Sequence, residues 1–113
     1  MVEINYSPDR GDIIWISLDP TLGRELQKRR PALILTPKAY NLKTSLALIV
    51  PITSKVKGYS FEVALPIDLS IQGVILTDQI RSIDWRSRDA QFITTTSIAL
   101  INAVRAKQKA LLP

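Results

Sequence analysis

The chain has 113 residues, of which 46% are hydrophobic, and it carries a net charge of +5 with an isoelectric point near 9.8. This length supports one hydrophobic core, so we expect a single domain over residues 1–113. The sequence contains neither Cys nor His. That inventory excludes disulfides, the usual zinc sites and any catalytic triad built on His. The positive charge favours an anionic partner such as a nucleic acid or an acidic protein.

Apolar runs in the sequence are short. None reaches the roughly eighteen residues of a membrane-spanning helix, and the N-terminal segment MVEINYSPDRG lacks the basic and apolar regions of a signal peptide. We therefore expect a cytoplasmic protein without a membrane partner. We also expect no metal and no cofactor, and catalysis would have to use Asp, Glu, Lys, Arg, Tyr, Ser or Thr.

The segment from Gly11 to Pro37 predicts a strand, a charged loop and a second strand. An apolar run rich in β-branched residues stops at Asp19, and another begins at Ala32. The loop between them places an acid beside several cations, which are Arg24, Glu25, Lys28, Arg29 and Arg30. Loops positioned by strands commonly carry binding and catalytic groups. A solvated connection is the alternative interpretation.

Six further segments have the composition of strands or connectors. Residues 38–45 form a polar connector with room for a helical turn, and residues 46–51 are apolar at nearly every position, as in a strand buried on both faces or closed into a barrel. Shorter strands are expected at 60–65, 73–77, 80–85 and 91–95. The ten residues before Gly11 read as a loose lead-in.

The C-terminal segment predicts the main helix. Thr96 or Ser97 can cap its first turn, and apolar residues recur at three- and four-residue intervals from Ile98 onward. Many short strands followed by one helix favour a mainly β fold, a small, strongly curved antiparallel sheet or barrel. The two tryptophans, Trp15 and Trp85, are expected in the core or at a dimer interface, and stacking of one on an RNA base is a further possibility.

Polar residues follow three of the apolar strands. Glu25 and Arg30 lie on the first loop, Thr53 and Ser54 follow the strand LALIVP, and Asp78 and Gln79 follow GVILT. In order, the blocks GDIIWISLDPTLGRE, RRPALILTP, YNLKTSLALIVPITS, KGYSFEV and GVILTDQIRSIDWR, with the C-terminal helix, resemble the MazF/PemK toxin family, most closely its MazF branch. The resemblance covers nearly the whole chain from Gly11 onward.

The resemblance implies an SH3-like barrel, a homodimer and the toxin of a type II toxin-antitoxin system. Such a toxin is a metal-independent, sequence-specific endoribonuclease that cuts single-stranded RNA, often mRNA, and so inhibits translation. Its antitoxin partner would cover the RNA site with an acidic C-terminal segment. Two positions depart from many relatives. Lys28 stands where they have Gly, and Leu76-Thr77 stands where some PemK-like relatives have an Arg before the Asp-Gln pair.

The family's catalytic positions fall on Glu25, Arg30 and Thr53. The resemblance places the family's Asp-Gln pair beside the site on Asp78 and Gln79, and a basic residue implicated in RNA contact on Arg86. Further substrate contacts are expected from Ser54, Lys57 and Arg81. Arg30 offers a planar, permanently charged group that matches phosphate oxygens. Glu25 is the favoured general base, Asp78 is a weaker candidate for catalysis, and Thr53 can hydrogen-bond to phosphate.

Other interpretations of these residues stay open at this point. Glu25 could form only a surface ion pair, Thr53 could simply end a strand, and Asp78 could stabilise a turn. A barrel that binds RNA or protein without cleavage would use the same basic loops. A gyrase-directed toxin related in fold to CcdB is the third alternative.

Overall fold

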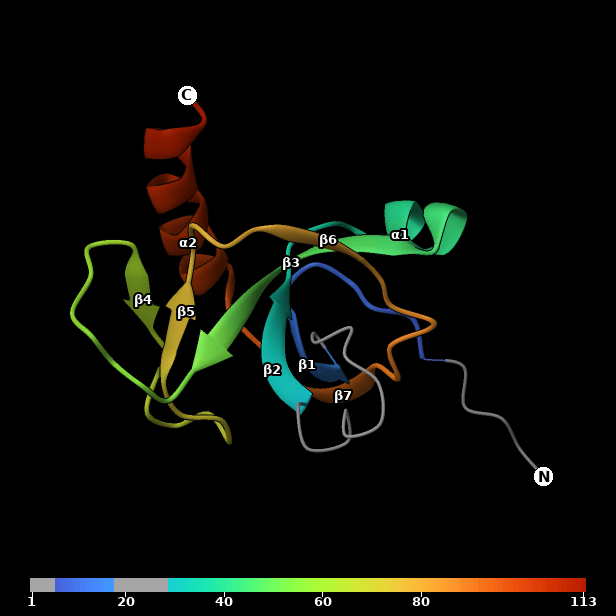
Figure 1. Ribbon diagram of the computed structural model, residues 1–113, viewed down its shortest axis with the longest axis horizontal. Helices are drawn as coiled ribbons and strands as arrows, with labels where there is room; N and C mark the ends of the chain where they lie inside the picture. The colour runs from blue at the N-terminus through green and yellow to red at the C-terminus, as the bar shows by residue number, and fades with distance from the viewer. Residues whose placement is uncertain (1–5, 18–28) are drawn as a thin grey trace.

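The computed structural model describes residues 6–17 and 29–113, so the predicted site residue Glu25, with Arg24 and Lys28, lies outside the described residues. The elements in this part of the chain are short strands, one helix after β2 and a second helix at the C-terminus (Figure 1). They are β1 (Asp12–Ser17), β2 (Arg29–Ile34), α1 (Lys38–Thr44), β3 (Leu46–Thr53), β4 (Glu62–Ala64), β5 (Val74–Leu76), β6 (Arg81–Asp84), β7 (Gln91–Thr95) and α2 (Ile98–Leu111).

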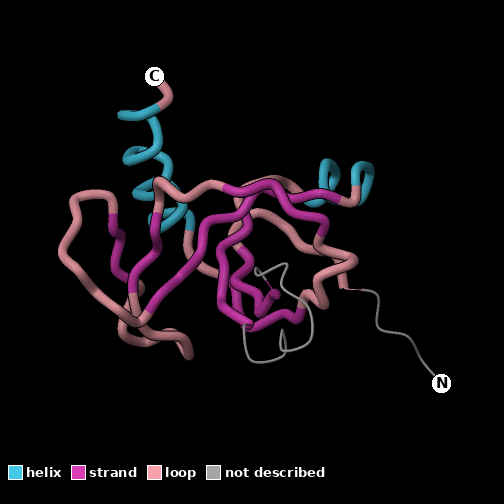
Figure 2. The backbone as a smooth tube through the Cα atoms, in the orientation of Figure 1, coloured by secondary structure: helices cyan, strands magenta, loops and turns pink. Residues whose placement is uncertain are grey.

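The strands of the described chain form one antiparallel, strongly curved sheet in the order β4-β5-β3-β2-β1-β7, with β6 also paired to β3. Strand β3 lies at its centre because it pairs with β2 on one edge and with two strands on the other. Its first half, Leu46–Ile49, pairs with β6, and its last residues, Ile52 and Thr53, pair with β5. Figure 2 shows how strongly the backbone of this sheet curves. The predicted mainly β, barrel-like fold is confirmed, although the described strands do not close into a complete barrel.

Both faces of the central strands are buried. Successive side chains of a strand point to opposite faces, and here one set, which includes Ile14, Ile34 and Ile49, packs inside the curved sheet with Ile83 and Trp85. The other set, which includes Ile13, Leu33, Val50 and Ile52, is covered by Leu100 and Val104 of α2. The unbroken apolar run from residue 46 therefore arises because β3 has no solvent-facing side over most of its length.

Several predicted elements differ in detail from the structure. Strand β3 extends to Thr53, two residues beyond its predicted end, so Thr53 belongs to the strand. The connector after β2 is the seven-residue helix α1, which is more than one turn. Strand β4 is limited to Glu62–Ala64, and β2 begins earlier than predicted, at Arg29. Of the two candidate caps of α2, Ser97 is the one used, since its side chain accepts a hydrogen bond from the N–H of Leu100 at 3.2 Å.

The described part of the lead-in before β1, residues 6–11, is held in place rather than loose. The Tyr6 hydroxyl donates to the Asp12 carboxylate at 2.6 Å, and burial together with this bond raises the pKa of Tyr6 well above its usual range. The fully buried Asn41 donates to the carbonyl of Pro8 at 2.8 Å. No helix in the described ranges is long and apolar enough to cross a membrane.

Candidate functional site

The site lies where strands β2 and β3 separate. Their pairing runs Ile34 with Ile49, Leu33 with Val50 and Ala32 with Pro51, and it ends there. Pro31 has no N–H to donate to β3, so the ladder is weakened at this end. If the register were continued by two residues, Arg30 would stand opposite Thr53. The fold thus brings together two predicted site residues from different strands, at the place where the two strands separate.

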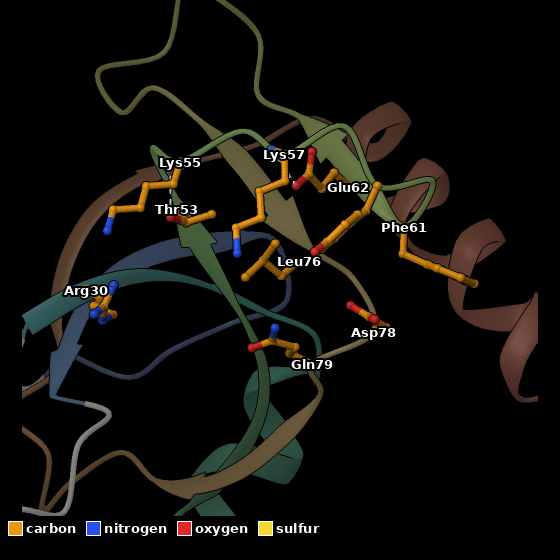
Figure 3. Close-up of a pocket in the computed structure, with 10 residues that line it drawn as sticks. Arg30, Thr53, Lys55, Lys57, Phe61, Glu62, Leu76, Asp78 and Gln79 are labelled. Atoms are coloured by element: carbon orange, nitrogen blue, oxygen red, sulfur yellow. Dashed lines mark hydrogen bonds between the residues drawn. The ribbon is translucent and has the colours of Figure 1, made fainter.

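A cavity of about 330 Å³ lies at this opening (Figure 3). Its walls come from the start of β2, the end of β3, the loop between β3 and β4, and the turn after β5. Most of the lining residues are polar or charged: Arg30, Thr53, Lys55, Lys57, Tyr59, Phe61, Glu62, Leu76, Asp78 and Gln79. Five of these are predicted site residues, so the predicted constellation converges in space.

A second cavity, of about 290 Å³, adjoins the first. Its walls come from β1, β2, the end of β3 and the loop before β5, and they are Trp15, Arg29, Arg30, Pro31, Ile52, Thr53, Ser54, Lys55, Ser70, Ile71 and Gln72. Among the residues that the structure describes, Arg30, Thr53 and Lys55 line both cavities. These three residues form the shared boundary of the two cavities, called the passage below, and contribute two positive charges and a hydroxyl group to it.

The Thr53 hydroxyl is oriented by its own turn. Its oxygen accepts a hydrogen bond from the backbone N–H of Lys55 at 3.1 Å, which leaves the hydroxyl proton available for a bound anion. Gly73 also packs directly against the backbone carbonyl group of Thr53. A Cβ on Gly73 would lie 2.3 Å from the carbonyl oxygen of Thr53, and Gly73 has a φ of +130°. Only glycine fits this close approach without a backbone shift.

A carboxylate stabilises the loop that carries Lys57. Glu62 accepts hydrogen bonds from the backbone N–H groups of Lys57 at 3.1 Å and Gly58 at 3.0 Å. The Lys57 side chain extends into the cavity, where its amine lies 6.0 Å from the centre of the Tyr59 ring. We therefore interpret Glu62 as a positioning residue, whose two oxygens are already engaged by the loop.

The turn that carries Asp78 and Gln79 is anchored at Thr77. The N–H of Gln79 donates to the carbonyl of Leu76 at 3.1 Å, and the fully buried Thr77 donates its hydroxyl to the carbonyl of Phe61. Helix α2 adds a third bond, from the Gln108 amide to the carbonyl of Thr77 at 3.0 Å. These bonds hold the two side chains at the rim of the cavity, where both are exposed.

The other predicted site residues are distributed as follows. Ser54 lines the second cavity. Arg81, on β6 opposite Ile49, and Arg86, whose guanidinium lies 4.4 Å from the centre of the Trp85 ring, line neither cavity. Trp85 is a core residue, as one interpretation held, whereas Trp15 is half-buried in the wall of the second cavity.

Sequence reasoning missed Lys55 and Glu62. The signal for Lys55 is its place two residues after Thr53, in the basic stretch Lys55-Val56-Lys57. Across the described ranges, no group of three or more Asp and Glu side chains is placed to hold a metal ion.

Comparison with known proteins gives consistent results. Residues 9–112 match the family model described as the PemK-like, MazF-like toxin of type II toxin-antitoxin systems. The chain is 45% identical over 102 residues to the endoribonuclease toxin MazF of Escherichia coli K12, covering 90% of this chain and 91% of that protein. It is 36% identical over 108 residues to the endoribonuclease PemK of Escherichia coli, with coverages of 92% and 81%.

Solved structures show the same similarity. The crystal structure of MazF from Deinococcus radiodurans matches with a TM-score of 0.87 and 45% identity, over 96% of this chain and 98% of that one. A MazE-MazF structure from the same organism matches with a TM-score of 0.85 and 42% identity, with coverages of 96% and 97%.

The curved antiparallel sheet with a C-terminal helix is thus the architecture of a toxin class from type II toxin-antitoxin systems. The chain belongs to the PemK-like, MazF-like toxin family, and it is an endoribonuclease toxin of that family. The predicted family and enzyme class are confirmed.

Proposed function

We propose that the chain cleaves single-stranded mRNA at a short sequence, without a metal ion, and thereby inhibits translation in the cytoplasm. The observation that carries this proposal is the passage between the two cavities, lined by Arg30, Thr53 and Lys55. A phosphodiester at this point would meet two cations and a hydroxyl group, and each adjoining cavity would receive one of the flanking nucleotides. Single strands suit such a site because their bases can turn outward.

The proposed reaction is an internal transfer at phosphorus. The ribose 2′-OH loses its proton to a general base and its oxygen bonds to the adjacent phosphorus. The bond from phosphorus to the 5′ oxygen breaks, and that oxygen takes up a proton. The products are a 2′,3′-cyclic phosphate and a 5′-OH. Arg30 stabilises the charge that develops on the phosphate oxygens, and Thr53 donates a hydrogen bond that orients them.

We propose Glu25 as the general base. It precedes β2 by four residues in the sequence, and a carboxylate is the natural base in a chain with no His. Asp78 is the second candidate because it lines the first cavity. Turnover should be compared in Glu25→Gln and Asp78→Asn, each of which replaces a carboxylate with an amide. The base is the residue whose replacement stops cleavage.

Binding would depend on phosphate contacts beyond the reacting one. We propose Lys55 and Lys57 in the cavity wall as such contacts, with Ser54 and Gln79 as hydrogen-bonding groups. Arg81 and Arg86 are proposed to contact RNA outside the cavities. The partners proposed for this chain are a second copy of itself, in a homodimer, and an antitoxin whose acidic segment occupies the basic cavity. The mycobacterial and Deinococcus neighbours include complexes with a cognate antitoxin or with MazE, which supports the second of these.

The binding of RNA is expected to weaken as salt concentration rises, because each neutralised phosphate releases counterions. Lys57→Ala should lower the slope of log affinity against log salt by about 0.7, the value for one contact on a single strand. Fluorescence anisotropy with an RNA that carries 2′-deoxyribose at the cut position would measure this without cleavage. Lys109→Ala, an exposed lysine of α2 outside both cavities, is the matched control. A wild-type affinity that did not vary with salt would contradict the assignment.

The test of the proposed function is cleavage of a long, unstructured RNA in EDTA, with mapping of the cut positions and end groups. The proposal predicts cuts at one short sequence that leave a 5′-OH and a 2′,3′-cyclic phosphate. Intact RNA from folded protein free of antitoxin would contradict it. Inhibition of DNA supercoiling by that same preparation would favour the gyrase-directed alternative, and RNA binding without cleavage would favour the non-catalytic barrel.

A further inference from the structure

The second cavity has a composition that phosphate binding does not explain. Beyond the three residues of the passage, one cation lines it, Arg29, whose guanidinium donates to the Gln91 side chain at 2.6 Å. The other lining residues are uncharged: Trp15, Pro31, Ile52, Ser54, Ser70, Ile71 and Gln72. The first cavity, in contrast, contains Lys57, Glu62 and Asp78. The first cavity therefore carries three further charged side chains, whereas the second combines one already hydrogen-bonded arginine with an aromatic residue and neutral hydrogen-bonding groups.

The two tryptophans of the chain have different environments. Trp85 is 6% exposed, and its indole N–H donates to the carbonyl of Asn41 at 3.1 Å, so it is a core residue with its polar atom satisfied. Trp15 lies on the sheet face that carries Ile13, toward the end of β1, and is half-buried in the cavity wall. Aromatic side chains in this situation are platforms on which a base can stack.

Gln72 offers the groups needed to distinguish one base from another. Its side chain is exposed, and one amide N–H donates to the carbonyl of Ile67 at 3.3 Å. This bond fixes the side chain but leaves a second N–H and the amide oxygen for a ligand. An amide that donates and accepts at once is suited to a base edge that carries the opposite pair of groups, as adenine does.

We propose that the second cavity is a nucleobase subsite, in which Trp15 stacks on the base next to the cleaved phosphodiester and Gln72 hydrogen-bonds to its edge. This proposal rests on the proposed function, because it takes the phosphate between the cavities as given. Gln72 is then a specificity-determining residue, and Trp15 supplies binding at the same nucleotide.

The test measures kcat and KM on a set of RNAs in which each position around the cut is varied in turn. Gln72→Ala should lower the preference for one base, at a single position beside the cut, by about tenfold, with kcat on the best substrate changed less than threefold. Trp15→Leu should raise KM about tenfold at that nucleotide, and Trp15→Phe, which keeps a ring for stacking, should restore most of the binding.

Asn102→Ala removes an exposed amide from α2 that lines neither cavity, and it serves as the matched control. Because Trp15 is half-buried, thermal unfolding of its variants should be measured beside the kinetics, whereas the exposed Gln72 permits a test without that concern. Unchanged base preference at every position in Gln72→Ala would overturn the subsite while leaving RNA cleavage intact. Absence of cleavage by the wild type would overturn both proposals.

Discussion

Arg30→Ala is expected to lower the turnover of RNA by about two or three decades, the usual cost of removing one donor to a charged transition state. Arg30 lies at the start of β2, is exposed, and lines both cavities. Its guanidinium can hold two phosphate oxygens at once, and charge increases on those oxygens as the 2′ oxygen attacks. The loss should therefore appear mainly in kcat, measured by single-turnover cleavage of a short RNA.

Two further variants make this expectation specific. Arg30→Lys keeps the charge but loses the planar fork, so its turnover should lie between those of the wild type and Arg30→Ala. Arg105→Ala removes an exposed arginine of α2 outside both cavities and should leave turnover near that of the wild type. Turnover of Arg30→Ala within a factor of a few of the wild type would remove Arg30 from the catalytic role.

Gly73→Ala is expected to be the most damaging change outside the cavity lining. The new Cβ would lie 2.3 Å from the Thr53 carbonyl oxygen and 2.9 Å from its carbonyl carbon. Both are backbone atoms, so the end of β3 or the start of β5 must move. The positive φ of Gly73 adds strain of about 1–3 kcal/mol. Because a displacement of about 1 Å can cost a hundredfold in rate, we expect turnover to fall by about that factor in folded protein.

Gly11→Ala is the control that distinguishes the effect of backbone strain at a glycine from the effect of displacing Thr53. Gly11 also has a positive φ, of +93°, but the nearest atom to its Cβ is the end of the flexible Ile101 side chain, at 2.9 Å. This variant should lose stability in thermal unfolding, and its folded fraction should cleave RNA at close to the wild-type rate. Equal turnover in both glycine variants would show that Gly73 does not position Thr53.

The sequence was sufficient to predict the fold class and the core of the site, for physical reasons. Runs of β-branched residues alternate with turn residues, and this pattern predicts strands reliably. Arg30 and Thr53 are each at the end of an apolar run, and the antiparallel pairing of β2 with β3 brings those ends together. The resemblance supplied their roles, while the structure supplies the proximity of the two residues.

The other residues of the site could not be predicted because their positions depend on loop geometry, which the periodicity of apolar residues does not encode. Lys55 lines the passage because of the turn that follows Thr53, and Glu62 is engaged by the N–H groups of a loop rather than by a cation. Arg86 was expected to contact RNA because of its family position and its charge, and the structure places its guanidinium over the Trp85 ring, outside both cavities. Trp15 and Trp85 looked equivalent in sequence, since only the covering elements determine which tryptophan is buried.

The position of the reacting phosphate is the central claim, and a crystal structure with a short RNA carrying 2′-deoxyribose at the cut position would test it most directly. This RNA has the scissile phosphate but lacks the attacking hydroxyl group. We expect its phosphate oxygens within hydrogen-bond distance of the Arg30 guanidinium and the Thr53 hydroxyl, with the two flanking nucleotides in separate cavities. A scissile phosphate bound away from Arg30 and Thr53, with the passage between the cavities empty, would contradict the account.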